Sequence, residues 1–287
     1  MRVLLTGATG QIGGFMLPRL RDAGIEVVAH SRNPHDSDFG EQWIVGDLRC
    51  HDPFEHNGSF DVWVHLGFLS LTTSWFKSAQ AAGVTRFVSF SSTSIFTKSD
   101  SSSGKERQII AELIDAERGV MEGCEAVEIA WTILRPTMIY GAGRDQNVAF
   151  VETMIRRFGV FPLVGGGLGK RMPVHADDLA WAAFAAMQRE AAKNRSYNLG
   201  GGEILAYRQF VEKIFTRLGK PARILSLSLP CARLIAKLVA VVPGFGHVTP
   251  AMFERMMADL VFDYSDAVRD LDYHPRCFMC DSGEQQQ

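Results

Sequence analysis

The sequence predicts an α/β fold, in which a doubly wound parallel sheet is followed by a smaller, mostly helical C-terminal lobe. Two observations lead to this prediction. Short apolar runs alternate with helical patterns through the first half of the chain, and this order builds parallel sheets with helices on both faces. A glycine-rich turn at residues 7–13 joins the first apolar run to the first helical pattern, which gives the strand–turn–helix order of such a sheet.

The elements follow in order from the spacing of apolar residues. Residues 3–5 form an apolar strand, and residues 12–23 carry apolar side chains at helical spacing before Gly24 ends the helix. The same alternation predicts strands at 26–29, 43–45, 62–66, 86–90 and 131–134, and helices at 74–82 and 109–121.

The pattern changes after about residue 160, where glycine loops and helices replace the alternation. Helices are expected at 176–188, 207–218, 229–241 and 249–259. We therefore expect a first domain over residues 1–160 and a small substrate-binding lobe over residues 161–287. Their boundary is diffuse, because residues 199–220 are expected to pack back on the first domain.

Composition narrows the classes of function. The 287 residues are 46% hydrophobic and 22% charged with a net charge of −2, which is ordinary for a globular protein and provides no basic surface for nucleic acid. The most apolar stretch, residues 225–245, is interrupted by two prolines and two basic residues and makes a poor membrane span. The first residues have the pattern of a core strand rather than a leader. We expect a cytoplasmic protein that binds no nucleic acid and has no membrane span.

The cysteines predict free thiols rather than a metal site. Their number is five, and only Cys277 and Cys280 have the spacing of a ligand pair. No second pair accompanies them, and an isolated pair of this kind is weak evidence for a metal. We therefore expect no metal.

The glycine-rich turn carries the strongest functional signal. Gly7 permits a tight turn, Gly10 allows backbone N–H groups to approach a pyrophosphate, and Gly13 allows the helix to pack closely on the strand. The N-terminus of the following helix favours an anion. The pattern predicts a Rossmann-type dinucleotide-binding domain over residues 1–160. The alternative is a glycine turn without a ligand.

The GxxGxxG spacing of this turn resembles the short-chain dehydrogenase/reductase superfamily, and in particular its extended, NAD-dependent epimerase/dehydratase family and atypical relatives. The resemblance continues in order at 46–48, 65–67, 86–92, 134–141, 171–180, 197–201 and 271–276. It implies that a dinucleotide is bound by Gly7, Thr9, Gly10, Gln11, Ile12, Gly13, Ser31, Arg32, Asp47, Leu48, Leu66, Gly67, Phe68, Pro136 and Met138.

The end of the second strand bears on the choice of coenzyme. NAD-selective sites usually place an acid there for the ribose hydroxyls, whereas this sequence has Ser31 followed by Arg32. A guanidinium suits a 2′-phosphate. We therefore expect NADP, with NAD as the alternative if Arg32 stacks on the adenine or faces solvent.

The family's reaction centre is only partly present. Ser92 fits the serine that follows the fifth strand, and it is the candidate catalytic residue. The resemblance implies a Tyr-x-x-x-Lys pair on the next helix, but anchoring that helix on Ala116 and Glu117 puts Ile109 and Leu113 at these positions. No tyrosine occurs before Tyr140. Charges that could substitute as proton carriers, or simply be exposed, are Lys98, Lys105, Glu106 and Glu112.

Two arginines are candidates for substrate binding in the second part of the chain. Arg171 precedes His175 in a segment similar to one in which nucleotide-sugar relatives hold a substrate diphosphate. Arg144 lies in a glycine loop that could cover the nicotinamide, with solvation as the alternative. Asp177 and Asp178 are expected to cap a helix that starts near residue 179.

Two functions therefore remain open. The first is an atypical NAD(P)-dependent epimerase, dehydratase or oxidoreductase that acts on a nucleotide-sugar or a related carbonyl or alcohol, with a non-standard proton carrier. The second is a catalytically inactive dinucleotide-binding protein with a regulatory, redox-sensing or assembly role. It would resemble the nitrogen-metabolite-repression regulators or an accessory subunit of mitochondrial complex I. Either could form a homodimer.

Overall fold

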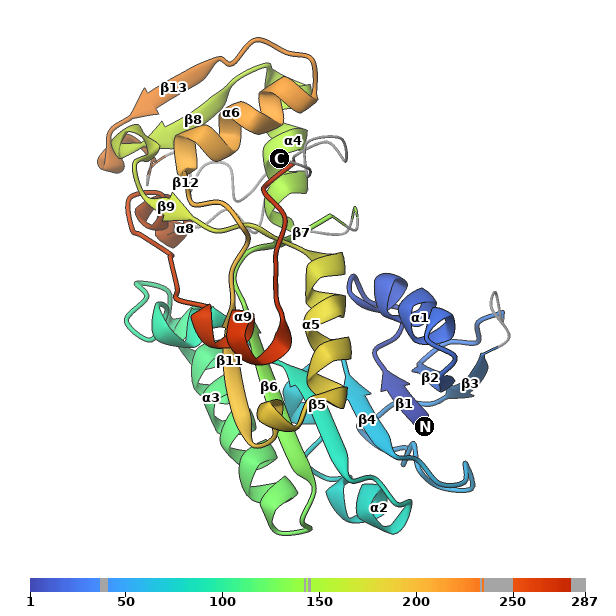
Figure 1. Cartoon of the computed structure of the whole chain (residues 1–287). Coiled ribbons are helices and arrows are strands. Elements are labelled where there is room, and N and C mark those ends of the chain that lie inside the picture. Colours follow the sequence, from blue (N-terminus) through green and yellow to red (C-terminus); the bar gives the residue numbers. More distant parts are fainter. Residues whose placement is uncertain (37–40, 142, 144–145, 233, 235–249, 280–287) are drawn as a thin grey trace.

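A seven-stranded parallel sheet forms the centre of the molecule (Figure 1). The computed structural model describes residues 1–36, 41–141, 143, 146–232, 234 and 250–279. The strand order is β11-β6-β5-β4-β1-β2-β3, so the chain starts in the middle of the sheet and winds outward in both directions, as expected for a doubly wound fold. The strands are β1 (Arg2–Thr6), β2 (Glu26–Ser31), β3 (Gln42–Val45), β4 (Val62–His65), β5 (Arg86–Phe90), β6 (Ala130–Pro136) and β11 (Arg195–Leu199).

Both faces of this sheet are buried, because alternate side chains of each strand enter different cores. Val3 and Leu5 pack with helices α1 (Gly13–Asp22) and α5 (Ala176–Gln188). Leu4, from the same strand, packs on the opposite face with α2 (Phe76–Ala81) and α3 (Gly104–Glu125). This arrangement explains the nearly continuous apolar runs that predicted the strands. The predicted α/β fold class is confirmed.

The seventh strand is one that the apolar pattern did not predict. Strand β11 pairs with β6 at the edge of the sheet, with Tyr197 opposite Leu134. The next helix, α6 (Tyr207–Arg217), does not follow it onto the sheet but packs in the core of the lobe. The position of a boundary between two domains remains a prediction.

The region beyond the central sheet contains small sheets as well as helices. Three two-stranded sheets pair β10 with β7, β12 with β9 and β13 with β8, and their core is closed by helices α4, α6 and α8. The helix predicted at 229–241 lies mostly outside the described residues. The elements are β7 (Ile139–Tyr140), α4 (Gln146–Phe158), β8 (Phe161–Val164), β9 (Lys170–Arg171), β10 (Val174–His175), β12 (Leu205–Ala206), β13 (Ile224–Leu227), α8 (Pro250–Arg255) and α9 (Ser265–Leu271).

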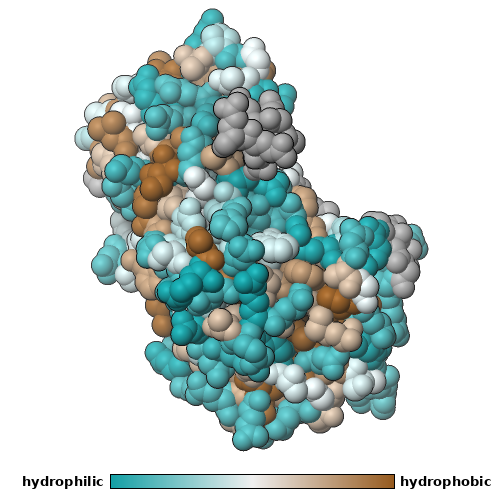
Figure 2. Space-filling model, viewed as in Figure 1, coloured by the Kyte–Doolittle hydropathy of each residue, from teal (hydrophilic) through white to brown (hydrophobic). Residues whose placement is uncertain are grey.

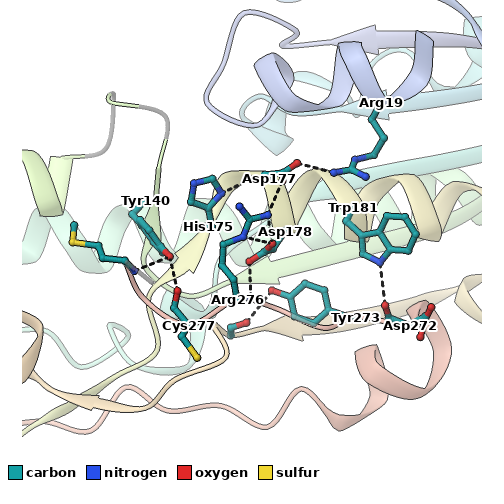
Figure 3. A network of polar contacts seen from close by, with 12 residues as sticks. Arg19, Tyr140, His175, Asp177, Asp178, Trp181, Asp272, Tyr273, Arg276 and Cys277 are labelled. Carbon is teal, nitrogen blue, oxygen red and sulfur yellow. Dashed lines mark hydrogen bonds and ion pairs between the residues drawn. The ribbon is translucent and has the colours of Figure 1, made fainter. Parts of the chain in front are cut away.

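The segment after α9, residues 272–279, returns to the start of α5 and is held there by ion pairs (Figure 3). Arg276 donates to Asp178 from Nε at 2.8 Å and to Asp177 from Nη2 at 2.6 Å. Arg19 of α1 reaches the other oxygen of Asp177 at 2.6 Å. This segment, here named the C-terminal strap, is therefore bound to the start of α5 and is linked through Asp177 to α1.

No helix in the described part of the chain is long and apolar enough to cross a membrane.

Candidate functional site

The turn between β1 and α1 has a backbone geometry that requires its glycines. Gly7 has φ +76°, and a Cβ atom there would lie 2.8 Å from the amide nitrogen of Gly67. A Cβ atom on Gly13 would lie 1.9 Å from the carbonyl oxygen of Ala8. Gly10 closes the turn by donating its N–H to the carbonyl of Gly7 at 3.0 Å. The turn therefore lies against the 66–67 segment at the carboxyl ends of β1 and β4, which is where parallel sheets bind ligands.

The N-terminus of α1 has no internal group to neutralise it. Its N-cap residue is Ile12, which has helical dihedral angles and makes no side-chain capping bond, and the first turn contains no acidic residue. Unsatisfied amides and the helix dipole at such an end attract an anion. The closely packed glycines and the uncapped helix therefore fit the diphosphate of a dinucleotide.

A buried histidine holds the neighbouring 65–68 segment in place. His65 Nδ1 lies 2.7 Å from the hydroxyl of Thr6, and His65 Nε2 lies 3.0 Å from the carbonyl oxygen of Phe68. Burial lowers the pKa of His65 to about 4, so the ring is neutral and donates through Nε2. Phe68, in contrast, is 83% exposed, and its expected contact with the cofactor remains a prediction.

Two arginines gather at the end of β2. Arg32 is exposed and lies close enough to Asp47 for its charge to lower the pKa of that carboxyl. Arg49 binds both oxygens of Asp47, with Nη2 at 2.5 Å, and its hydrogen bonds are the main reason that the pKa of Asp47 is lowered to about 2. Ser31 is buried, and its hydroxyl accepts the N–H of Asn33. Sequence reasoning had not identified Arg49.

The other expected cofactor residues surround the same edge of the sheet. Leu48 is buried and accepts the indole N–H of Trp75 through its carbonyl. Pro136 is buried at the end of β6, and its carbonyl accepts the hydroxyl of Thr93 at 3.1 Å. Met138 lies two residues further on and is half-buried. Their role as cofactor contacts remains a prediction.

A cavity of about 400 Å³ adjoins the glycine turn. Its wall includes Gln11 from the turn, Ser92 from the end of β5, and Met138. Tyr207 of α6 and Arg255 of α8 line it from the lobe. Figure 2 shows a step in the molecular outline where the lobe rises beside the α1–β3 part, and this face is mostly hydrophilic with small, scattered apolar groups.

Ser92 enters this cavity at the start of a 3₁₀ helix (Thr93–Phe96). Its hydroxyl oxygen accepts the N–H of Ser94 at 3.1 Å and lies 2.5 Å from the hydroxyl of Ser94. The structure thus brings Ser92 and the glycine turn to one cavity, as the sequence expected of a reaction centre. Its catalytic role remains a prediction.

The two candidate substrate arginines differ in what the structure shows of them. Arg171 lines the cavity, but its guanidinium already donates to the carbonyls of Lys170 and Ala258 at 2.7 Å and to that of Arg255. It also lies over the ring of Tyr207 at 5.1 Å. Arg144 lies outside the described residues. Arg171 therefore joins β9 to α8, and any substrate contact uses its remaining N–H groups.

The structure distinguishes the four side chains that could replace the tyrosine as proton carrier. Only Lys98 lines the cavity. Lys105 and Glu112 are exposed on α3. Glu106 is bound by Arg255 at 2.7 and 2.9 Å and by the hydroxyl of Ser101 at 2.6 Å.

The helix that would carry the tyrosine–lysine pair is anchored by an ion pair between Glu117 of α3 and Arg135 of β6, at 2.6 and 2.9 Å. On this helix Ile109 is 51% exposed, whereas Leu113 packs against the core beneath the sheet. Neither side chain can exchange a proton.

The described residues contain no group of three or more side chains that could hold a metal ion. Cys280 of the CxxC pair is not among them.

Comparisons with known proteins agree with this geometry. The NAD dependent epimerase/dehydratase family matches residues 3–200. The solved structure "MoeE5 in complex with UDP-glucose and NAD" has a TM-score of 0.72 at 20% identity, covering 97% of this chain and 95% of that one.

Three curated relatives resemble the chain. The 2-alkyl-3-oxoalkanoate reductase of Stenotrophomonas maltophilia is 25% identical, covering 96% of this chain and 95% of that protein. A mitochondrial subunit of Arabidopsis thaliana, NADH dehydrogenase [ubiquinone] 1 alpha subcomplex subunit 9, is 24% identical over 80% of this chain and 61% of that protein. The uncharacterized protein y4nG of Sinorhizobium fredii is 28% identical over 68% of this chain, which spans about half the length of that relative (50%). The family match covers most of the sequence and includes the glycine turn, the serine and the strands that place them, so the chain belongs to the NAD dependent epimerase/dehydratase family.

Proposed function

We propose that the protein is an NADP(H)-dependent enzyme that acts on a carbonyl or alcohol carbon of a nucleotide-sugar or related anionic substrate. One observation carries this proposal: Ser92 and the glycine turn, through Gln11, line the same cavity. The reacting carbon and the nicotinamide must meet in one place, and the cavity is that place.

The residues present fit the chemistry of this family in part. A bound dinucleotide supplies or accepts hydride. Ser92 then holds the oxygen of the reacting carbon through its hydroxyl, whose own oxygen is oriented by the N–H of Ser94. A hydroxyl in this position polarises the carbon–oxygen bond and orients it. A proton carrier must still serve that oxygen, and neither Ile109 nor Leu113 can do so.

The preference for NADP rests on charge at the end of β2. An acid at Ser31 would repel a 2′-phosphate, whereas Arg32 and Arg49 both lie beside Asp47. Arg49 already binds that carboxylate, which leaves Arg32 as the main candidate for the phosphate. Arginine binds phosphate through paired, charge-assisted hydrogen bonds.

The cavity wall favours an anionic substrate. It contains Lys98, Arg171 and Arg255, and no carboxylate side chain lines it in the described part of the chain. A nucleotide diphosphate or a carboxylate would both match this charge. MoeE5 binds UDP-glucose, and another relative is a 2-alkyl-3-oxoalkanoate reductase, so both substrate classes occur among similar proteins.

The test begins with binding. Quenching of tryptophan fluorescence by NADPH and NADH reports whether a dinucleotide binds. Turnover is then measured with UDP-glucose, a 3-oxo acid and 9,10-phenanthrenequinone. S92A should lower kcat by about 10²–10⁴-fold with any substrate that reacts, while S74A, an exposed serine before α2, should leave it unchanged. Unchanged kcat in S92A would remove Ser92 from the mechanism.

A second candidate function is supported by Ile109 and Leu113, because neither side chain can exchange a proton. A protein that keeps the glycine turn but has isoleucine and leucine at positions 109 and 113 suits a dinucleotide-binding regulatory or assembly role, and one relative is a subunit of NADH dehydrogenase. If NADPH binds tightly and none of the three probes is turned over, this candidate is favoured over the enzyme.

A further inference from the structure

The cavity has few groups that can exchange a proton. Its titratable wall residues are Lys98, Arg171, Tyr207 and Arg255 among those the structure describes. A guanidinium does not release its proton at physiological pH. Burial raises the pKa of Tyr207 to about 12, so that phenol keeps its proton. Only the amine of Lys98 remains.

Lys98 also differs from the arginines in its partners. Arg171 donates to carbonyls of β9 and α8, and Arg255 is bound to Glu106. The amine of Lys98 makes no hydrogen bond or ion pair with any described residue, although its side chain is half-buried. A half-buried ammonium without a partner is costly, because it has lost water and gained nothing in return. Its proton is therefore available to a ligand.

The backbone places Lys98 beside Ser92. Lys98 follows the 3₁₀ helix that Ser92 caps, and its backbone N–H donates to the carbonyl of Ser94 at 3.0 Å. Both side chains line the same cavity. A substrate oxygen held by Ser92 would thus lie in the cavity that the Lys98 side chain borders.

We propose that the amine of Lys98 carries the proton to and from the substrate oxygen in this cavity. The inference rests on the proposed function. In the direction of reduction, the carbonyl carbon receives a hydride, the π electrons move to oxygen, and Nζ–H of Lys98 gives its proton to that oxygen. The neutral amine then regains a proton from water. Oxidation of an alcohol runs the same transfer in reverse, with the amine as the base.

The surroundings of Lys98 adjust it for this task. Burial lowers the pKa of Lys98, and the positive charge of Arg255 on α8 lowers it further. Glu106 on α3 opposes this shift, but its carboxylate is already shared with Arg255 and Ser101. Arg171 and Tyr207 face the cavity from the lobe. A lysine with a lowered pKa gives up its proton more readily and is more often available as a base.

The first experiment measures the acidity of Lys98 without any substrate. Wild-type protein is labelled briefly with acetic anhydride from pH 6 to pH 11, and peptide mass spectrometry gives the labelling rate of each lysine. Lys105, exposed on α3, is the internal control. The labelling rate of Lys98 should rise at a lower pH than that of Lys105. In R255Q the rise for Lys98 should move to higher pH, and in E106Q it should move to lower pH. If the labelling rates of Lys98 and Lys105 rise over the same pH range, the proposal is overturned.

The second experiment separates proton transfer from charge. K98R keeps a cation but cannot release its proton, whereas K98M removes both. With 9,10-phenanthrenequinone and NADPH, both variants should lose about 10²–10⁴-fold in kcat, and K105R should behave as wild type. If Lys98 only attracts an anion, K98R will retain kcat within about threefold of wild type, which overturns the proposal.

The two proposals fail in different ways. Lack of NADPH quenching, or NADPH binding with no turnover by wild-type protein, overturns the enzyme function and with it the role of Lys98. Turnover that survives in K98R overturns the role of Lys98 alone.

Discussion

The imidazole of His65 accepts a hydrogen bond from the hydroxyl of Thr6, with Nδ1 and Oγ1 2.7 Å apart at the carboxyl ends of β4 and β1. The opposite nitrogen, Nε2, must carry the proton because it faces the carbonyl of Phe68. Thr6 in turn accepts the indole N–H of Trp63 at 2.9 Å. A neutral ring thereby ties the end of β1 to the segment that follows β4.

This arrangement predicts a loss of stability in mild acid. The pKa of His65 is lowered to about 4 in the folded protein, whereas an unfolded histidine titrates near 6.5. Between these values the unfolded chain binds more protons, so stability falls as pH decreases from about 6.5 to 4. The loss from His65 is about 2 kcal/mol between pH 7 and pH 5. Urea denaturation at the two pH values measures it.

Variants assign this acid sensitivity to one group. H65N should reduce the difference between pH 7 and pH 5 by about 2 kcal/mol, while H56Q, at an exposed histidine, should leave it unchanged. His30 is buried with a pKa lowered to about 4, so part of the sensitivity should remain in H65N. An unaltered pH dependence in H65N would contradict the assignment.

The glycine turn predicts opposite outcomes for two adjacent residues. G13A places a methyl group against the carbonyl of Ala8, whereas a Cβ on Gly14 meets nothing within 4 Å. We expect G13A to lose about 1–3 kcal/mol of unfolding free energy and to weaken NADPH binding at least tenfold. G14A should be as stable as wild type or up to about 1 kcal/mol more stable. Denaturation and fluorescence titration of both variants provide the comparison.

Coenzyme choice should depend on Arg32. Removing a charge-assisted contact to the 2′-phosphate should weaken NADPH binding about 10- to 100-fold in R32A, with little change for NADH. R21A is the control, since Arg21 lies on α1 and pairs with Asp22. Equal weakening of both coenzymes in R32A would show that Arg32 does not read the phosphate.

The ion pair between Arg255 and Glu106 links the lobe to α3. Both side chains are mostly buried, so R255M should cost about 1–2 kcal/mol, more than an exposed pair. R208A breaks the exposed pair with Glu212 on α6 and should change stability by less than about 0.5 kcal/mol. Chemical denaturation of the two variants measures their unfolding free energies. Equal losses would show that the pair between Arg255 and Glu106 contributes no more to stability than an exposed pair.

Most of the central sheet could be predicted from local patterns, because both of its faces are apolar. Strand β11 was not predicted because it contains no apolar run, since only Tyr197 and Leu199 of its five residues are buried. Helix α4 was missed although Val148, Val151 and Ile155 are buried at helical spacing, so the signal for it was present. The glycine turn was identified because its chemistry lies within seven consecutive residues.

Contacts between distant segments were beyond sequence reasoning. Asp177 and Asp178 were expected to cap a helix near residue 179, but α5 begins at Ala176 and is capped by His175, whose Nδ1 accepts the N–H of Asp177. The two carboxylates are instead bound by Arg19 and by Arg276 of the C-terminal strap. Likewise, Arg255 lies 149 positions from Glu106, and no local pattern in the sequence connects them.

The C-terminal strap has a consequence for how the chain is made. Arg276 lies 99 residues after its partner Asp177, so a ribosome working at about 5–20 residues per second releases the carboxylates roughly 5–20 s before the guanidinium. During that interval Arg19 is present to pair with Asp177, but Arg276 is not. The ion pairs between the strap and α5 therefore form only after α5, α6 and α9 have all been synthesised.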